Sequence, residues 1–408
     1  MSSKGQRYVM SRADEIYRLD RQVAKELKNI QESKDINLDT IMRFYTHSVA
    51  SGLSLARIKK ILYSLRKLSR WLDKRFEDAT KEDIVNLVAK VERSGLSQRT
   101  IQDFRKFIKQ LYKWIRQTDD PPPEVRWIKA GELVGNSIAK KDLLTVEEVD
   151  RIIENARDIQ DKALFSVLFD SGRRLGEILG LRIGDVEFDS LGARLSVDGK
   201  VGKDIVRICA SAPRLAIWMD NHPSRSNPSA PLWIKVGCPK AEQRPYSSVR
   251  NRLEQAVARA GIKKRVWAYL FRHSRITPAS TRLTYAELCH VFGWKQGSDM
   301  PHFYVHLSGD DRDNAFLKMN GLPMQANGSD NNGTYAPVVC PRCKRTNSPD
   351  AKYCNGCGLA LNLEFAVRFD QTKDQLKHKI ETLTDELVKS PEVVDALLQA
   401  LSGLREDS

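Results

Sequence analysis

The sequence predicts a mainly α-helical protein with a small β-hairpin or sheet, an α+β class built from more than one domain. Three observations predict it: long stretches with apolar residues every three or four positions, one short alternating stretch, and four closely spaced cysteines near the C-terminus. The chain has 408 residues, enough for two or three domains with their own cores. Its 41% hydrophobic and 29% charged residues are typical of a soluble globular protein.

The first part of the chain is predicted to be helical. Residues 1–35 are a charged N-terminal segment, expected to be a helix with a loose end, and residues 36–120 are expected to form a small helical domain. Its apolar residues recur at helical spacing at Ile58, Ile61, Leu62, Leu65, Leu68 and Leu72, and at Ile101, Phe104, Ile108, Leu111 and Ile115. Thr80–Asp83 is typical of a capping box, and Ser97 can cap the last helix. Residues 51–120 hold 17 Lys and Arg against 9 Asp and Glu, which favours a basic helical domain; a bundle without a ligand is the alternative.

The middle of the chain changes character after a run of three prolines in "TDDPPPEVRW". Proline cannot continue a helix, so a linker is expected over residues 121–141. A second capping box, Thr145–Glu148, opens a mixed domain over residues 142–322. Within it, "ARLSVDGKVGKDIVRICA" alternates like two short strands about a Gly-Lys turn. The remaining predicted segments are a flexible linker (323–337), a cysteine module (338–361) and an amphipathic helical tail (362–408).

The charge of the chain indicates its class of partner. The formal net charge is +15 and the isoelectric point is about 9.4. A basic excess of this size favours a polyanion, with nucleic acid as the first candidate; a basic surface that is merely solvated is the alternative. No run of eighteen apolar residues and no apolar signal core occur in the sequence. We therefore expect no membrane partner and a cytoplasmic, nucleoid-associated protein.

Four of the seven cysteines form two C-x-x-C pairs, "CPRC" and "CNGC", separated by ten residues. Tetrahedral zinc takes four thiolates, and C-x-x-C turns present two sulfurs at the required spacing. The pattern predicts a structural zinc site in a compact zinc ribbon, with the ligands Cys340, Cys343, Cys354 and Cys357. Two redox dithiols are the competing interpretation, but the thioredoxin-like context is missing. The pattern leaves open whether the ribbon contacts DNA or protein.

One tyrosine, Tyr304, lies in "GWKQGSDMPHFYVHLSG", where neither helical nor strand periodicity accounts for it. Three basic residues have distinctive contexts: Arg174 after a glycine in "SGRRLGEILGLRIGDV", Lys200 at the turn of the alternating stretch, and Arg272 in "YLFRHS". Each alone is more often a solvated or salt-bridged side chain. Together they suit phosphoryl transfer, in which arginines hold the non-bridging oxygens and a tyrosine hydroxyl attacks the phosphorus. We find no Gly-rich phosphate loop or carboxylate cluster for magnesium, and expect no cofactor in catalysis.

Residues 35–360, approximately, resemble the tyrosine recombinase (phage integrase) family, in particular archaeal site-specific integrases with a C-terminal zinc ribbon. Four short motifs carry the resemblance in the family's order. The first, "SGRRLGEILGLRIGDV", implies that Arg174 holds the phosphate beside its companion Glu177. The hairpin "GKVGKDIVRI" implies that Lys200 protonates the leaving 5′-oxygen, with Lys203 as the second candidate.

The other two motifs imply the remaining site residues. "YLFRHS" resembles the second arginine motif, with Arg272 as the second phosphate ligand. "FGWKQGSDMPHFYVHLSG" resembles the third motif and nucleophile, with Trp294 where the family has His or Trp, and Tyr304 as the attacking residue. Tyr269 occupies the position that the family commonly gives to a histidine. Tyrosine ordinarily titrates near 10, so it is a poorer base at neutral pH, and Tyr269 as a hydrogen-bond donor, His273 or water remain open for the proton transfer.

The resemblance implies that residues 36–120 are a SAM-like core-binding domain that binds DNA and that residues 142–322 are the catalytic domain. It further implies a site-specific DNA recombinase that acts on double-stranded DNA as a tetramer and is a monomer or dimer when free. The helix expected over residues 310–322 would dock on a neighbouring protomer. A DNA-relaxing enzyme of the type IB topoisomerase class is one alternative, because it uses the same chemistry without pairing sites. A non-catalytic DNA-binding regulator is another.

Overall fold

The structure is a computed structural model of the whole chain. It describes residues 12–129, 131, 138–199, 202–235, 237, 241–308, 316, 319–320, 335, 337–361, 377 and 379–382. Within these residues no helix is long and apolar enough to cross a membrane. Most of the predicted helix over 310–322, of the linker over 323–337 and of the helical tail over 362–408 lies outside the described residues.

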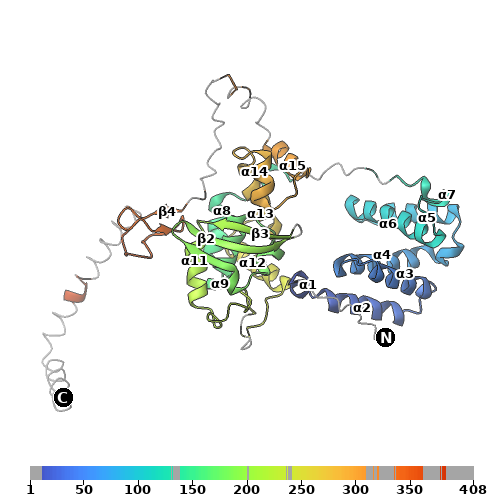
Figure 1. Cartoon of the computed structure of the whole chain (residues 1–408), viewed down its shortest axis with the longest axis horizontal. Helices are drawn as coiled ribbons and strands as arrows, with labels where there is room; N and C mark the ends of the chain where they lie inside the picture. Colours follow the sequence, from blue (N-terminus) through green and yellow to red (C-terminus); the bar gives the residue numbers. More distant parts are fainter. Residues whose placement is uncertain are drawn as a thin grey trace, which may run out of the picture.

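The described residues form two large bodies and a small cysteine-rich module (Figure 1). The first body is a helical bundle of α2 (Leu19–Glu32), α3 (Leu38–Ala50), α4 (Leu55–Leu72), α5 (Lys81–Glu92), α6 (Gln98–Arg116) and α7 (Pro123–Arg126). The helices of the second body are α1 (Arg12–Tyr17), α8 (Val146–Glu154), α9 (Ile159–Ser171), α10 (Leu175–Leu179), α11 (Ala212–Asp220), α12 (Tyr246–Arg259), α13 (Ala268–Ala279), α14 (Tyr285–Phe292) and α15 (Met300–Ser308). Its strands are β1 (Val186–Asp189), β2 (Gly192–Gly199) and β3 (Gly202–Ile208), and the module has β4 (Val338–Val339) and β5 (Thr346–Asn347). The mainly α fold with small antiparallel sheets confirms the predicted fold class.

The helical bundle follows the apolar pattern of its sequence. The residues of α4 and α6 that recur at helical spacing, Ile58 and Ile108 among them, are buried in one hydrophobic core, except Leu72 and Ile115, which are partly buried against it. The capping box at Thr80–Asp83 is present, with each residue's side chain accepting from the other's backbone N–H, and Ser97 caps α6. The core continues past the prolines, since Val125 is also buried in it.

The second body is built on α9, which is buried on all sides between the sheet and the surrounding helices. Its sheet has the order β1-β2-β3, and both neighbouring pairs are antiparallel. The predicted pair of strands is confirmed as β2 and β3, whose residues pair from Ala193 with Ile208 to Gly199 with Gly202. The sequence reading missed β1, because its four residues are too few and too exposed to show alternation.

The N-terminal segment differs from the single helix expected for it. It forms two helices, α1 and α2, separated at Arg18, which has the left-handed φ of 50°. Ile16 of α1 is buried in the core of the second body, whereas Val23 and Ile30 of α2 are buried in the bundle core. The segment therefore connects the two bodies (Figure 1).

Candidate active site

Tyr304 lies on α15, and its side chain is fully buried. It belongs to a small apolar cluster that α13, α14 and α15 form together. Its ring centroid is 5.5 Å from that of Trp294 and 5.4 Å from that of His273. Tyr304 is therefore a helical residue, and its isolation in the sequence reflects the shortness of α15 rather than an irregular loop.

Arg272, on α13, is fully buried within reach of Tyr304. Its guanidinium donates to two backbone carbonyls, Gly172 O and Phe292 O, both at 2.9 Å, and its Cζ lies 5.0 Å from the centroid of the Trp294 ring. No carboxylate among the described residues pairs with it. Burial and the charge of Arg174 both lower the pKa of Arg272, which means that this cation is held without a direct counter-charge.

Arg174 approaches the site from the N-terminus of α10. It follows Gly172, which has φ of +59° and lies so close to the Phe292 ring that an added Cβ would come within 2.7 Å of it. The Arg174 guanidinium pairs with Glu177 Oε1 at 2.7 Å, and the arginine side chain is 32% exposed. This carboxylate also faces the end of β2, because a Cβ on Gly199 would lie 3.3 Å from Glu177 Oε1.

Several buried polar atoms around Tyr304 have no hydrogen-bond partner among the described residues. They are Arg272 Nε, Trp294 Nε1, Tyr304 Oη and His273 Nδ1. Buried polar groups in folded proteins are nearly always paired, and leaving one unpaired costs about 1–3 kcal/mol. Two N–H donors and a hydroxyl left unpaired in one place favour an anionic ligand that is bound there during function.

The two titratable neighbours in this cluster are both neutral near pH 7. Burial raises the pKa of Tyr304, Tyr269 adds to the rise, and Arg272 opposes it. Burial lowers the pKa of His273 to about 4, and the charge of Arg272 adds to this. A neutral imidazole therefore stands beside a neutral phenol, so His273 is in the protonation state of a proton acceptor.

The other predicted residues differ in their placement. Tyr269 is half-buried on α13, one helical turn from His273, with the two ring centroids 4.7 Å apart. Lys200 lies outside the described residues, between the end of β2 and the start of β3 in the sequence. Lys203 is exposed on β3 opposite Asp198. The structure thus brings Tyr304, Arg272 and Trp294 together, with Arg174 and Tyr269 beside them.

Sequence reasoning missed Arg173, the neighbour of Arg174. It is buried, and its guanidinium pairs with Asp204 of β3 at 2.5 Å. Gly293 leaves room for this guanidinium, because a Cβ there would lie 2.0 Å from Arg173 Nη1. Arg173 thus ties the first arginine motif to the hairpin and to the segment before α15. Nothing local in "SGRR" distinguishes the two arginines; only the distant Asp204 does.

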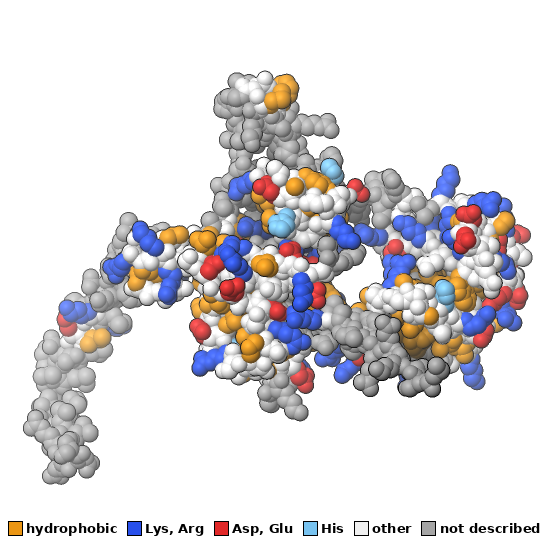
Figure 2. Space-filling model, in the orientation of Figure 1, with side chains coloured by type: hydrophobic (Ala, Val, Ile, Leu, Met, Phe, Trp, Pro, Cys, Tyr) orange, Lys and Arg blue, Asp and Glu red, His pale blue; other side chains and the backbone are white. Residues whose placement is uncertain are grey.

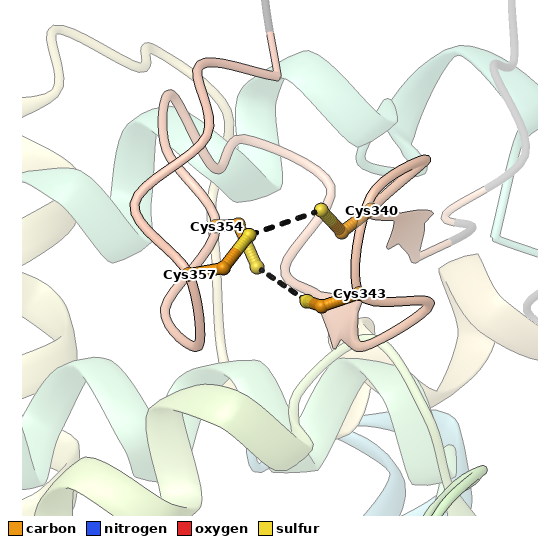
Figure 3. A group of neighbouring side chains, drawn as sticks. All are labelled: Cys340, Cys343, Cys354 and Cys357. Carbon is orange, nitrogen blue, oxygen red and sulfur yellow. Dashed lines mark hydrogen bonds between the residues drawn. The ribbon is translucent and has the colours of Figure 1, made fainter.

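The four cysteines predicted to bind zinc come together in the module (Figure 3). Their sulfurs all lie within 4.8 Å of one another, with 3.6 Å between Cys340 Sγ and Cys357 Sγ and 3.4 Å between Cys343 Sγ and Cys354 Sγ. Four thiolates at about 2.3 Å from a tetrahedral zinc would be spaced about 3.8 Å apart, so the donor set fits the ion. The Gly356 N–H also points at Cys354 Sγ at 3.4 Å, as expected for a thiolate ligand.

The module contacts the second body through α11. Arg214 of α11 pairs with Asp350 of the module, and Tyr335, just before the module, packs edge-on against Phe169 with ring centroids 4.9 Å apart. Tyr335 is buried in the core of the second body. The described part of the module is therefore anchored beside α9 and α11 rather than separate from them (Figure 1).

Basic side chains cover both large bodies (Figure 2). On the helical bundle, an open hollow of about 880 Å³ lies between α3 and α6. Its lining includes Arg43, Lys106, Lys109 and Lys113 together with the aromatic ring of Trp114. Neither Lys106 nor Lys113 forms an ion pair within the described part of the chain. A surface of this kind suits a phosphate backbone.

Comparison with protein families finds one match. Residues 142–309 match the model of the phage integrase family. The match covers the second body from the start of α8 to the end of α15, and so includes all the described residues around Tyr304.

Curated relatives and solved structures agree with this match. The chain is 27% identical over 245 residues to tyrosine recombinase XerC of Chromobacterium violaceum, which covers 58% of this chain and 79% of the relative. It is 28% identical over 174 residues to tyrosine recombinase XerA of Pyrococcus horikoshii, covering 42% of this chain and 56% of the relative. Among solved structures, XerH site-specific recombinase bound to a palindromic difH substrate has the same fold, with a TM-score of 0.53 at 16% identity over 76% of this chain and 98% of XerH.

Proposed function

We propose that this chain, a site-specific DNA recombinase of the tyrosine recombinase family, cuts and rejoins DNA through a 3′-phosphotyrosine formed by Tyr304. The observation that carries this proposal is the group of buried, unpaired polar atoms around Tyr304. Arg272 Nε and Trp294 Nε1 are donors for the oxygens of a phosphodiester, and Tyr304 Oη is the only hydroxyl among the unpaired atoms beside them. Their convergence supports a nucleophile held against a phosphate.

The proposed reaction is a transesterification in each direction. Tyr304 Oη attacks the phosphorus, a bond forms between them, and the bond to the 5′-oxygen breaks. Arg272, Arg174 and Trp294 hold the non-bridging oxygens, whose negative charge grows in the transition state. The 5′-oxygen takes a proton from Lys200 as it leaves, and rejoining reverses these steps with a 5′-hydroxyl as the attacking group. The reaction conserves the energy of the broken ester, so no cofactor is required for it.

His273 is the residue that we propose as acceptor of the Tyr304 proton. The family position usually given to histidine holds Tyr269 here, but His273 is one helical turn further along α13 and its ring faces that of Tyr304. Its pKa of about 4 keeps it neutral at physiological pH, and its Nδ1 atom has no partner among the described residues. Tyr269 then supplies a hydrogen bond rather than a base.

Double-stranded DNA is the proposed substrate, gripped between the helical bundle and the body that holds Tyr304. The basic hollow on the bundle and the charge of +15 support a phosphate backbone as the ligand. The division of the chain into a core-binding domain over 36–120 and a catalytic domain over 142–322 fits this arrangement. By the same family resemblance we propose that strand exchange takes place in a tetramer on DNA.

The four-cysteine module is proposed to be a zinc ribbon. Cys340, Cys343, Cys354 and Cys357 would hold one zinc ion, and because all four ligands come from the protein, its role would be structural. Chelation is expected to release the module from α11 without abolishing attack by Tyr304. Zinc content by elemental analysis, together with limited proteolysis before and after chelation, would test both parts. A protein that binds no zinc, or that loses DNA cleavage at the same rate as zinc, would contradict the proposal.

A covalent trap tests the proposed nucleophile. The protein is incubated with nicked duplexes from its genomic neighbourhood, so that the cleaved fragment diffuses away, and the denatured products are examined for DNA-linked protein. We expect a linked band that Tyr304→Phe abolishes and that the matched variant Tyr269→Phe retains. A band that survives Tyr304→Phe but not Tyr269→Phe would assign the nucleophile to Tyr269.

A second assay separates recombination from relaxation. A plasmid with two cognate sites is expected to yield recombinant products, whereas a type IB topoisomerase would only relax supercoils. Salt-sensitive binding without a covalent band on any substrate would instead support a DNA-binding regulator.

A further inference from the structure

The N-terminal helix α1 lies against the short helix α10, which carries Arg174 and Glu177. Arg12 Nη1 donates to Gly180 O at 3.2 Å, at the C-terminal end of α10, and pairs with Asp185 Oδ2 at 2.8 Å. Ile16, on the same helix, is 2% exposed and lies in the core of the second body. α1 thus reaches α10 across more than 160 residues of sequence.

The ring of Tyr17 closes over the first turn of α10. A Cβ on Gly176 would lie 3.0 Å from Tyr17 Oη and 3.4 Å from its Cε2, so the ring rests directly on this glycine. On its other side, Tyr17 packs against Tyr246, with ring centroids 5.1 Å apart. Burial raises the pKa of Tyr17, and the nearby Tyr246 and Glu177 add to the rise. The Tyr17 hydroxyl is therefore a neutral neighbour of the carboxylate that pairs with Arg174.

α1 is also joined to the helical bundle. Gln22 of α2 donates its side-chain amide to Tyr17 O at 2.5 Å, and Lys59 of α4 donates to the Gln22 side chain. Arg66 of α4 pairs with Glu26 of α2 at 3.0 Å, and both side chains are mostly buried. A movement of the bundle is thereby passed through α2 to the residues that touch α10.

We propose that residues 12–17 are a positioning clasp, which holds α10 and its Arg174–Glu177 pair in register when the helical bundle closes on DNA. The described side chains of the clasp, Arg12, Ile16 and Tyr17, do not touch the reacting atoms, so the effect of the clasp is on the rate of the chemical step rather than on contact with DNA. Displacing a substrate-holding group by about 1 Å can cost about 100-fold in rate. The proposal rests on the role proposed above for Arg174.

A paired substitution tests the contact itself. Gly176→Ala pushes a methyl group against Tyr17 Oη, and Tyr17→Phe removes the atom it would meet, leaving the ring at ordinary contact distance. Gly180→Ala is the matched control, because it adds the same methyl group to the residue that caps α10, where the nearest atom is 3.4 Å away. The rate of phosphotyrosine formation is measured in a single turnover at saturating nicked DNA, and the DNA dissociation constant is measured separately.

We expect Gly176→Ala to slow cleavage about tenfold while DNA affinity stays within about twofold. Tyr17→Phe and Gly180→Ala should each cleave within about twofold of the parent rate, and the double variant Gly176→Ala with Tyr17→Phe should recover most of the loss. A Gly176→Ala protein that cleaves at the parent rate, or a double variant without recovery, would overturn the clasp.

Amide hydrogen exchange on the DNA-free protein separates this idea from the proposed reaction. Replacing both Arg12 and Tyr17 by alanine should speed exchange in residues 174–180, whether or not any DNA is cleaved. Unchanged exchange there would overturn the clasp even if cleavage is normal. Absence of phosphotyrosine in the parent protein, with faster exchange in the variant, would count against the proposed reaction and in favour of the clasp contact.

Discussion

Two buried arginines in the same body, Arg272 and Arg244, have opposite surroundings. Both side chains are completely buried, but Arg244 pairs with the carboxylate of Asp161 at 2.5 Å, and Arg252 reinforces that carboxylate. Arg272 has no carboxylate partner among the described residues and is held by two backbone carbonyls and the face of Trp294. A buried cation with its own counter-charge is compensated within the fold, and its removal leaves a buried carboxylate unpaired, whereas a buried cation without a counter-charge can bind an external anion.

The largest expected effect comes from Arg272→Gln. The change removes a charge that we propose to hold the phosphate, and cleavage by Tyr304 should fall about 1,000-fold or more. The free energy of unfolding should not fall, because a cation without a buried counter-charge is costly to bury. Single-turnover cleavage and thermal unfolding of the same preparation measure the two effects. A stable protein with parent-like cleavage would remove Arg272 from the site.

The converse is expected for Arg244→Gln. It leaves Asp161 as a buried carboxylate without its main partner, and the free energy of unfolding should fall by about 3–5 kcal/mol. The fraction that remains folded should cleave nicked DNA at the parent rate, since Arg244 pairs with Asp161 and is not among the residues clustered around Tyr304. Urea unfolding measures the loss of stability, and the cleavage rate normalised to the amount of folded protein measures the activity. Loss of cleavage in the folded fraction would show that Arg244 also contributes to cleavage and not only to the stability of the fold.

Only some of the features that distinguish these two arginines could be predicted from the sequence. The capping boxes at Thr80–Asp83 and Thr145–Glu148 were predictable because both partners lie within four residues of each other. Arg272 was found through its motif, but the motif does not reveal that Arg272 lacks a buried carboxylate partner and that Arg244 has one. Their difference depends on Asp161, which is 83 residues from Arg244 in the chain, and such partners meet only in the folded state.

The same reasoning applies to the contacts of the N-terminal segment and to Arg173. Tyr17 meets Gly176, and Arg173 meets Asp204 of the hairpin, through packing of elements that are distant in sequence. The four cysteines are the opposite case: their ligand spacing is local, so the cluster could be predicted in full. Sites whose residues lie close together in the sequence could therefore be predicted, whereas pairs of residues that are distant in sequence could not.

The uncompensated charge of Arg272 should also affect the pH dependence of cleavage, through the proposed proton acceptor His273. Because burial and Arg272 lower its pKa to about 4, His273 stays neutral as pH rises from 5.5 to 8. Cleavage at subsaturating DNA, which reports the free protein, should be flat across this range and fall only as His273 gains a proton at lower pH. His273→Asn should slow cleavage by about 100-fold, whereas Tyr269→Phe should cost less. An inflection near pH 6.5 in the parent protein would mean that His273 titrates as it does in water.

The smallest effect is expected at Asp150 of α8, a half-buried acid near the cysteine module. Burial raises its pKa from 3.8 to about 6, the charge of Asp350 adds to the rise, and Arg214 opposes it. The folded protein therefore holds a proton between pH 4 and 6 that the unfolded chain has released, so stability falls as pH rises through this window and stays lower above it.

Asp150→Asn removes that penalty. Since the carboxyl is still partly exposed to solvent, the expected gain at pH 8 is modest, about 1 kcal/mol in the free energy of unfolding, and it should vanish near pH 4. Glu147→Gln, on the exposed face of the same helix, is the control for loss of a negative charge. Unfolding curves at the two pH values give the difference directly. An equal gain for both variants would trace the effect to net charge, whereas a gain confined to Asp150→Asn at high pH places it in the buried contact between α8 and the module. Unlike Arg272, Asp150 would then be a partly buried charge that lowers the free energy of unfolding and has no role in cleavage.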